Sequence, residues 1–580
     1  MKNKEIAQIF RDIADILEIK GANVFRIRAY QRASQNIEGL TRDVADYAQE
    51  GKLREIPGVG ADLAARISEY IQSGRIEFYE KLKKSIPSGL LDLLNIPGIG
   101  PKTAKLLYQE RGIKNVSGLN KAIAAGKLSG LEGIKEKTIE NIKKGIEIYQ
   151  SAKEKMTLAQ AINLAQDFLE PLKKLPSVEK ITAGGSLRRC KESVRDIDLL
   201  AVSGQPQKLI SAFVKLPLVS QVLAHGPTKS AIRTASGTQV DLRVVERKSF
   251  GSALVYFTGS KNFNIKLRII GQKFGLKVNE YGIFSATKRG GSANNFGGKY
   301  ICGASEEEVF KRLGLAYIPP ELREDNGEIE LAKENKLPRL VEIKDLRGDL
   351  HIHSTWSDGG NTIAEMARAA QARGYAYIAI TDHSQSLRVA NGLSVADLKK
   401  KKAEIEKINR GMKDFRVFFA AEVDIDVNGN LDYSDSVLKE FDLVVAAVHS
   451  SFKLPQDKMT KRLIKACKNK YVNIIAHPTG RLFGVRQASE VNFKELFKVA
   501  RETNTHMEVS SFFNRLDLND LNCRLAKEMG VKVAINTDSH LVEHLAAMYL
   551  GVAVARRGWL EKSDVINTRP LQEFLKIIKK

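Results

Sequence analysis

The spacing of apolar residues changes twice along the chain. Over residues 1–150, apolar side chains recur every three or four positions, and glycine or proline interrupts them at short intervals. This pattern is typical of short amphipathic helices. From about residue 178 to 300, runs such as VEKITAGG, RDIDLLAV and TQVDLRVV favour strands. The sequence therefore predicts a helical N-terminal region followed by a mixed α+β region.

After Asp349, apolar strand-like runs alternate with helical segments. Seven such runs follow one another: GDLHIH, YAYIAITDH, RVFFAAEVDI, DLVVAAVHS, VNIIAHP, HMEVSS and VKVAINTDSH. Seven consecutive βα repeats predict a closed or nearly closed parallel α/β barrel. Before it, the polar, proline-containing stretch 318–345 predicts a linker or an interdomain strap. The lysine run 399–402 opens a helix, and we interpret it as a solvated face rather than a DNA contact.

The chain is long and strongly basic. Its 580 residues exceed what one hydrophobic core organises. Its 92 Lys and Arg residues outnumber 68 Asp and Glu, giving a net charge of +24. That surplus favours a polyanionic partner, although a generally basic soluble protein has the same composition. The four cysteines form no CxxC pair, which favours a reducing cytoplasm, and no apolar run reaches the roughly 18 residues of a membrane span.

Two near-identical glycine turns stand in the helical region, IPGVG at 56–60 and IPGIG at 96–100, with a weaker copy, GLEGIKEKT, at 130–138. The glycines of such a turn let backbone N–H groups face outward at a helix N-terminus, where a phosphate is favoured. One copy alone would fit a plain tight turn, but two copies in a basic chain resemble helix-hairpin-helix elements. These grip DNA without reading its sequence. The expected DNA contacts are Gly58, Gly60, Arg66, Gly98, Gly100 and Lys102.

Three aspartates carry the first candidate chemistry. Asp196 and Asp198 lie two apart on a predicted strand, so both carboxylates project from one face. Asp241, in the apolar run TQVDLRVV, brings a third carboxylate from a neighbouring strand. Such a set suits Mg²⁺ or Mn²⁺ shared with substrate phosphates, and two ions suit phosphoryl transfer. A DxD pair alone also occurs in exposed acidic turns, but the preceding GGSLRR favours a nucleotidyltransferase.

The glycine-rich run GGSLRRCKESVRDIDLL at 184–200 permits close backbone approach to a phosphate at Gly184 and Gly185. With VYFTGSKNFNIKLR at 255–268 and NEYGIF at 279–284, it resembles DNA polymerase beta and its family X relatives, over residues 1 to about 320. The resemblance implies catalytic metal ligands Asp196, Asp198 and Asp241, with Arg243 beside them at the primer end. It implies nucleotide contacts at Gly185, Ser186, Arg189, Tyr256, Phe257, Gly259, Asn264 and Arg268.

Three points stay open in that resemblance. Tyr256 and Phe257 would also fit a core aromatic pair. Val194 and Arg195 replace a Ser-Gly pair, which leaves part of the triphosphate contact undefined. The position of the relatives' Schiff-base lysine is Arg66, whose guanidinium stays protonated and cannot form an imine. We therefore expect weak or absent 5′-deoxyribose-phosphate lyase activity in residues 1–85, with Lys81, Lys83 or Lys84 as the alternative nucleophiles.

Six of the nine histidines fall at the ends of predicted barrel strands, together with three carboxylates. They are His351, His353, His383, His449, His477 and His540, with Asp358, Glu422 and Asp538. A lone histidine at a strand end is usually structural. Active sites of βα barrels, however, lie at these strand ends, and nine potential ligands gathered there favour a metal site. Imidazole with carboxylate suits Mn²⁺, Zn²⁺ or Fe, and nine ligands predict a cluster that activates water against a phosphoester.

The order HxH, TDH, E, H, HP, TDSH resembles the PHP family of phosphoesterases, over residues 345 to about 575. The resemblance implies three ions: one on His351, His353, Glu422 and Asp538, a second on Asp358, His383 and His540, and a third on Glu422, His449 and His477. Arg481 and Arg486, just after HPTG, would contact a DNA phosphate or lie on the surface as ordinary arginines. The whole fusion resembles bacterial and archaeal family X polymerases, which implies short-gap filling and a Mn²⁺-stimulated 3′–5′ exonuclease.

We thus predict a multidomain chain with an all-α helix-hairpin-helix N-terminal region, an α+β nucleotidyltransferase palm and thumb, and a (βα)₇ PHP barrel. The predicted ranges are 1–85 for a helical DNA-binding domain, 86–150 for helix-hairpin-helix fingers, 151–248 for the palm, 249–320 for the thumb, 321–344 for a linker and 345–580 for the barrel.

The predicted function is template-directed gap filling in base excision or end repair, with the barrel trimming 3′ ends. The expected partners are dNTPs and gapped or nicked DNA with a 5′ phosphate, for a cytoplasmic monomer without membrane association. A DNA-end-binding protein whose barrel is the sole enzyme is the alternative. A small-molecule phosphatase is disfavoured by the glycine turns and the net charge.

Overall fold

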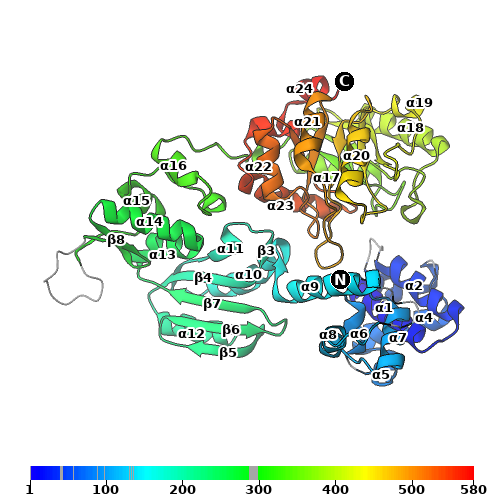
Figure 1. Cartoon of the computed structure of the whole chain (residues 1–580), viewed down its shortest axis with the longest axis horizontal. Coiled ribbons are helices and arrows are strands. Elements are labelled where there is room, and N and C mark those ends of the chain that lie inside the picture. The colour runs from blue at the N-terminus through cyan, green and yellow to red at the C-terminus, as the bar shows by residue number, and fades with distance from the viewer. Residues whose placement is uncertain are drawn as a thin grey trace. The chain divides into compact units, whose positions relative to one another are not determined.

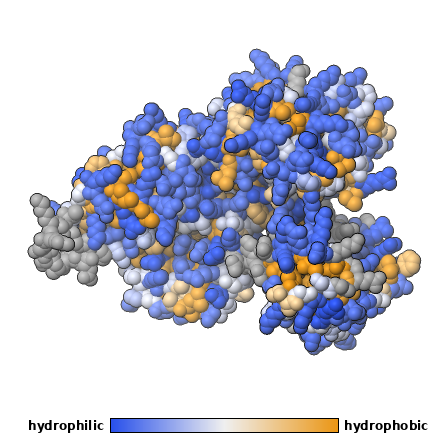
Figure 2. Space-filling view, viewed as in Figure 1, coloured by the Kyte–Doolittle hydropathy of each residue, from blue (hydrophilic) through white to orange (hydrophobic). Residues whose placement is uncertain are grey.

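The computed structural model describes residues 2–38, 43–56, 58–87, 89–96, 98–129, 131, 134, 136–285 and 298–579. The chain forms two compact units, Met1–Lys153 with Gly484–Gln487, and Glu154–Phe483 with Ala488–Lys580. On the face drawn in Figure 2, hydrophilic residues prevail and hydrophobic ones form separate patches. Among the helices within these ranges, none is long and apolar enough to cross a bilayer.

The first unit is helical, as its periodicity predicts (Figure 1). Its α-helices are α1 (Lys2–Ile19), α2 (Val24–Glu38), α3 (Val44–Gln49), α4 (Ala61–Ser73), α5 (Glu77–Lys84), α6 (Leu90–Leu94), α7 (Pro101–Arg111), α8 (Val116–Ala124) and α9 (Glu136–Glu154). They pack around two apolar cores. One core contains Ile56 and Val59 of the first glycine turn, and the other contains Ile96 and Ile99 of the second. Each turn is therefore fixed by its own helical module. Residues 57, 97, 130, 132, 133 and 135, which belong to the three turns, lie outside the described residues.

A five-stranded sheet in the order β2-β4-β7-β6-β5 opens the second unit. Its strands are β2 (Val178–Ala183), β4 (Asp196–Ser203), β5 (Val219–His225), β6 (Lys229–Thr234) and β7 (Gln239–Val244). On one face, Ile197 and Leu199 join the core formed with α10 (Leu158–Lys173) and α12 (Pro206–Val214). On the other, Leu200 packs with α13 (Phe250–Thr258). Because side chains alternate along a strand, Asp196 and Asp198 lie on the face of α13.

The thumb follows directly. It consists of α13, α14 (Lys261–Lys273), the antiparallel strands β8 (Leu276–Asn279), β9 (Gly282–Ser285) and β10 (Tyr300–Cys302), and α15 (Glu306–Arg312). The following polar stretch is an ordered strap with η3 (Pro320–Leu322), α16 (Glu328–Lys333) and η4 (Ile343–Asp345). Its Leu322 and Ile329 enter the thumb core, which also takes Trp559 from the barrel. The apolar residues of this polar segment therefore pack against the thumb, and the segment is a folded strap.

Seven parallel strands, paired in chain order, confirm the predicted barrel (Figure 1). They are β11 (Gly348–Ile352), β12 (Tyr377–Ile380), β13 (Arg416–Asp424), β14 (Leu443–Ala447), β15 (Ile474–Ile475), β16 (His506–Ser510) and β17 (Val533–Asn536). A parallel bridge between Ile352 and Ser539 brings the last strand to the first. The surrounding helices are α17 (Ile363–Ala372), α18 (Val395–Gly411), α20 (Gln456–Cys467), α21 (Phe493–Glu502), α22 (Asp520–Glu528) and α23 (Met548–Arg557), and α24 (Leu571–Ile578) stacks Phe574 on Tyr377.

One lysine of α18 contradicts the interpretation of the run 399–402 as a solvated face. Lys399 and Lys400 are exposed, but Lys401 is fully buried. Its ammonium donates to the carbonyls of Ile380 and Ala420, both at 2.9 Å, and lies 2.9 Å from the Asp382 carboxylate. A buried ammonium is tolerated only with such partners. Periodicity places Lys401 on the inner face of the helix, and the sequence alone did not reveal its acceptors.

Candidate active sites

The three palm aspartates meet on adjacent parallel strands. In the register of β4 and β7, Asp198 stands opposite Asp241, and Asp196 stands opposite Gln239. Burial and the negative charges of Asp196 and Asp241 raise the pKa of Asp198 to about 6. Carboxylates held this close repel one another unless a cation lies between them, so the donor set fits a divalent ion. Gln239, which the sequence reasoning missed, donates its amide to both Asp241 oxygens at 3.1 Å.

The glycine pair of the phosphate loop lies directly against these carboxylates. The Gly184 amide donates to the Asp198 carbonyl at 2.7 Å. Gly185 has φ +61°, and a Cβ built on it would lie 2.2 Å from Asp198 Oδ2. Only glycine meets both the backbone and the space requirement here. Ser186 follows in the short helix α11 (Gly185–Arg188), directly after this loop.

Arg189, a predicted nucleotide contact, is bound to other protein groups. Its Nε lies 2.9 Å from Glu324 Oε1 of the strap, and its Nη1 donates to the Thr258 carbonyl at 2.7 Å. The neighbouring Arg188, not singled out from sequence, binds Glu306 through two hydrogen bonds of 2.7 Å. Burial alone would raise the pKa of Glu306, but Arg188 and Arg323 lower it to about 2. The arginine pair therefore fastens the phosphate loop to the thumb and the strap.

The predicted nucleotide turn is assembled at the end of α13. Tyr256 and Phe257 are only half-buried and pack edge to face at 5.2 Å, which excludes a plain core pair. Asn264 donates to the Tyr256 and Gly259 carbonyls, at 2.7 and 3.1 Å. A Cβ on Gly259 would meet the Phe263 ring at 2.5 Å.

This turn faces the carboxylate site. The Arg243 guanidinium lies 4.6 Å from the centre of the Phe257 ring, and a Cβ on Gly184 would lie 3.6 Å from Phe257 Cβ. Arg268 lines a small pocket together with Tyr256 and Asn264. Every palm and thumb residue predicted from sequence therefore lies on this one side of the sheet, although Arg189 is engaged with Glu324.

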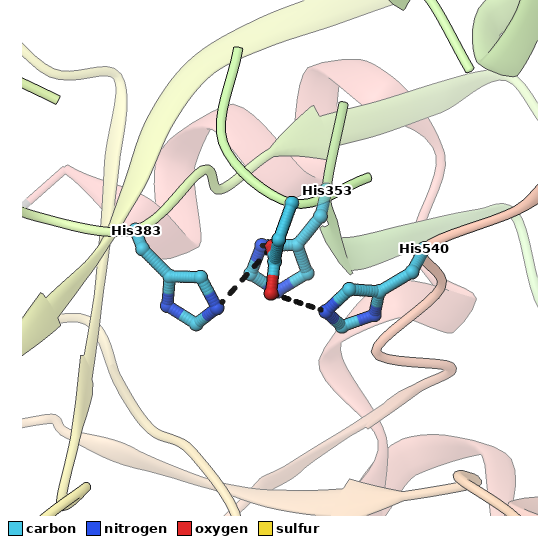
Figure 3. A group of neighbouring side chains, drawn as sticks. His353, His383 and His540 are labelled. Carbon is cyan, nitrogen blue, oxygen red and sulfur yellow. Dashed lines mark ion pairs between the residues drawn. The ribbon is translucent and has the colours of Figure 1, made fainter. Parts of the chain in front are cut away.

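The nine predicted ligands of the barrel converge at the C-terminal ends of its strands. Glu422 of β13 lies at the centre: its carboxylate is 2.9 Å from His383 Nδ1, 3.0 Å from His477 Nε2 and 3.3 Å from His449 Nε2. Figure 3 shows His353, His383 and His540 around one carboxylate, and Asp358 lies 3.5 Å from both His383 and His540. Three groups have ligand atoms close enough for one ion: His353, Asp358, His383 and His540; His351, His353 and Asp538; and His383, Glu422 and His449. These groups share histidines and differ in detail from the three sets that the resemblance implies.

Two of the buried imidazoles have the unpartnered ring nitrogens that a metal ligand needs. His351 Nε2 and both ring nitrogens of His353 are buried without a hydrogen-bond partner. Buried polar atoms are rarely left in this way unless an ion takes the place of a partner. Burial and the nearby His540 and His383 lower the pKa of His353 to about 4, so its ring is neutral and its lone pair free. The site thus has the donor types that Mn²⁺, Zn²⁺ or Fe requires.

A second layer of acceptors orients these rings. Glu508 Oε1 lies 2.7 Å from His351 Nδ1, Asp424 Oδ1 lies 2.6 Å from His449 Nδ1, and the Asp538 carbonyl lies 2.9 Å from His540 Nδ1. Such partners fix the tautomer and leave the opposite nitrogen for a metal. The sequence reasoning missed Glu508 and Asp424. The available signal was a single acidic residue inside an apolar strand, as in HMEVSS.

Arg481 is engaged inside the second unit. Its Nη2 lies 2.8 Å from the Glu192 carboxylate of the palm, and it also donates to the carbonyls of Arg515 and Leu516. Arg515 in turn lies 3.3 Å from Asp538. Arg481 is therefore neither a free surface arginine nor available to a phosphate in this arrangement.

In the first unit, both glycine turns leave open helix N-termini. Gly58 and Gly98 have φ of +80° and +95°, which favours glycine. Gly60 and Gly100 cap α4 and α7 without a side-chain hydrogen bond, and a Cβ on either meets nothing within 4 Å. The space beside the cap residue of each helix is therefore open. Near the second cap, Lys102 is exposed.

Arg66 is less free than predicted. Its guanidinium lies 3.1 Å from Asp62 and stacks at 4.1 Å on the Phe78 ring. A phosphate at this position would therefore compete with the Asp62 carboxylate.

Comparison with known proteins agrees with this geometry. Family models match as a helix-hairpin-helix domain at residues 1–76, a SAM-like helix-hairpin-helix tandem at 90–147, the DNA polymerase beta thumb at 253–324 and the PHP domain at 349–513. A probable phosphatase of Thermoanaerobacter sp. (strain X514) is 31% identical over 39% of this chain and 94% of that protein. DNA polymerase lambda of Rattus norvegicus is 26% identical over 56% of each chain.

One relative matches from end to end. The DNA polymerase/3′-5′ exonuclease PolX of Bacillus subtilis (strain 168) is 38% identical over 100% of both chains. The match includes the helix-hairpin-helix region, the thumb and the barrel in the same order. The chain therefore belongs to the family X DNA polymerases that carry a C-terminal PHP domain.

Proposed function

We propose that this chain is a gap-filling DNA polymerase whose PHP barrel removes nucleotides from 3′ ends. The observation that carries the proposal is the presence of two complete, separate ligand sets in one chain. Asp198 and Asp241 stand in register beside a glycine loop, while nine other ligands converge in the barrel. The full-length likeness to a polymerase/3′-5′ exonuclease supports the pairing of both activities.

In the palm, Asp196, Asp198 and Asp241 would hold Mg²⁺ or Mn²⁺. Two such ions stabilise the attacking and leaving oxygens of phosphoryl transfer. The loop at Gly184 and Gly185 permits close approach of the triphosphate of a dNTP, which the Ser186 hydroxyl would contact. Arg189 contributes to that contact once it leaves Glu324, which lies 2.9 Å away. Phe257, stacked under Arg243, then borders the sugar of the incoming nucleotide.

In the barrel, the nine ligands would hold up to three Mn²⁺, Zn²⁺ or Fe ions. Such ions supply a hydroxide at neutral pH and neutralise phosphate charge. Glu508 and Asp424 hold the His351 and His449 rings in place through their Nδ1 atoms. Asp358 and His540 are the exposed members of the set, with 32% and 26% of their side chains accessible. A phosphodiester therefore enters on their side.

The DNA partner is a gapped or nicked duplex with a 5′ phosphate. The open N-termini of α4 and α7 bind backbone phosphates, a mode that is independent of sequence. Because one chain carries both ligand sets complete, a monomer suffices. The four cysteines are free thiols, which accords with work in a reducing cytoplasm.

A gapped-duplex assay tests the proposal. The chain is incubated with Mn²⁺ and a labelled primer facing a one-nucleotide gap, with and without dNTPs. We expect extension by one residue with dNTPs and shortening from the 3′ end without them. Shortening under both conditions would instead identify a DNA-end-binding nuclease without polymerase activity, and no reaction under either would overturn both parts.

A further inference from the structure

Two adjacent phenylalanines lie at the rim of the barrel site and have no part in the ligand set. Phe512 and Phe513 follow β16, in the segment that leads to α22. Their ring centres are 4.7 Å apart with an interplanar angle of 31°. Phe513 exposes 38% of its surface.

The pair adjoins the open side of the metal site. The Phe512 ring lies 6.2 Å from the ring of His540, a predicted ligand, and 5.8 Å from that of His544. His540 is 26% exposed, whereas His351 and His353 are fully buried. Phe512 therefore borders the exposed edge of the ligand set, and Phe513 lies next to it.

The segment that carries the two phenylalanines is held in place by hydrogen bonds just after them. Arg481 donates to the carbonyls of Arg515 and Leu516. Asp517 Oδ2 accepts hydrogen bonds from the Thr479 amide and hydroxyl, both at 2.8 Å, and from the Gly480 amide at 3.0 Å. Phe513 is thus an exposed side chain beside the half-buried Phe512, on a fixed support such as a stacking platform requires.

We propose that Phe513, backed by Phe512, stacks on the base of an unpaired nucleotide at the 3′ end that the barrel cleaves. Every base has a π face, so such a platform accepts all four bases, but a base inside a duplex is covered by its neighbours and is not available to it. The substrate class is therefore a frayed or single-stranded 3′ end. This inference rests on the proposed exonuclease activity.

The test uses the full chain with Mn²⁺ and two single strands that differ at the 3′ terminus. One ends in thymidine and the other in a stable abasic sugar, which keeps the phosphodiester but has no base. We expect the base-bearing end to be removed about tenfold faster at subsaturating DNA, as one base–aromatic stack implies. Phe513→Ala should bring the two rates together, and Phe513→Trp should keep them apart.

Leu521→Ala is the matched control, because Leu521 is a 70% exposed apolar residue on α22 of the same domain. It should leave the ratio of the two rates unchanged. Equal rates for both ends in the unsubstituted chain, or a ratio that survives Phe513→Ala, would overturn the platform while leaving the exonuclease in place. If the unsubstituted chain shortened neither end, the exonuclease proposal would fail and the platform with it.

Discussion

The palm and the barrel differ in how much of a metal site the protein itself builds. The palm offers three carboxylates on a partly open sheet face, with the Gln239 amide supporting one of them. The barrel buries most of its nine ligands and orients three of its histidines through Glu508, Asp424 and the Asp538 carbonyl. A carboxylate site of the Mg²⁺ type is completed by substrate phosphates and water, whereas partners that orient the ligands raise the affinity of the protein itself for its metal. The two sites should therefore respond differently to metal removal and to substitution of their supporting residues.

Metal removal should give the largest difference. After treatment with a strong chelator, desalting and dilution into Mg²⁺, we expect dNTP incorporation to recover at once and 3′–5′ degradation to be absent. The reason is that imidazole-rich ligands do not suit Mg²⁺, whereas the palm carboxylates do. Adding Mn²⁺ should restore degradation, measured on the same labelled strand. Full degradation in Mg²⁺ alone would contradict the comparison.

Gly185→Ala should affect only the palm. The new methyl group would meet Asp198 Oδ2 at 2.2 Å on a backbone with φ +61°. A displacement of about 1 Å in a catalytic carboxylate costs on the order of a hundredfold in rate, so we expect incorporation to fall by that factor. Gly204→Ala is the control, because Gly204 has open space around its Cβ position. Steady-state incorporation kinetics decide the outcome, and an unchanged rate in Gly185→Ala would refute the close approach.

Glu508→Gln should affect only the barrel. The amide keeps the size of the side chain but removes the charge beside His351 Nδ1, 2.7 Å away. Losing such a partner costs about 10- to 100-fold in metal affinity or activity. We expect degradation to fall within that range and bound metal, measured by elemental analysis, to fall with it. Glu495→Gln, on the exposed face of α21, should change neither.

Substitutions in the two glycine turns should lower the activities of both sites together, and they should have the smallest effect. Valine at Gly58 and Gly98 is strained at φ of +80° and +95°, in the turns that lead into the N-termini of α4 and α7. We expect DNA affinity to fall severalfold, equally for unrelated sequences, because the contacts are to the backbone. Gly74→Val is a matched control, with φ +70° but at the end of α4. Sequence-dependent losses in a binding titration would point to base readout.

Periodicity and the positions of strand ends were enough to predict most of both ligand sets from the sequence. Asp196 and Asp198 share a face because the strand period is two, and the barrel ligands converge because parallel strands end at one rim. Periodicity assigns a side chain to a face without naming its partner. For that reason Lys401 was misjudged, Glu508 was missed, and the pairing of Arg189 with Glu324 was not foreseen.

The structure of the strap also depends on contacts that its own sequence does not reveal. Its charged and proline-containing sequence predicted either a linker or a strap, because composition reports how polar a segment is on average. Leu322 and Ile329 decide the outcome by entering the thumb core, while Arg323 is buried against Glu306. These contacts join residues from distant parts of the chain, and local patterns do not contain them.

The central claim is that the palm and the barrel are chemically independent sites in one chain, and a reciprocal pair of variants tests it most directly. Asp198→Ala and His383→Ala are each assayed on one labelled gapped duplex, with and without dNTPs. We predict that Asp198→Ala abolishes incorporation and leaves 3′–5′ degradation largely intact, and that His383→Ala does the opposite. Loss of both activities in either folded variant would contradict the claim.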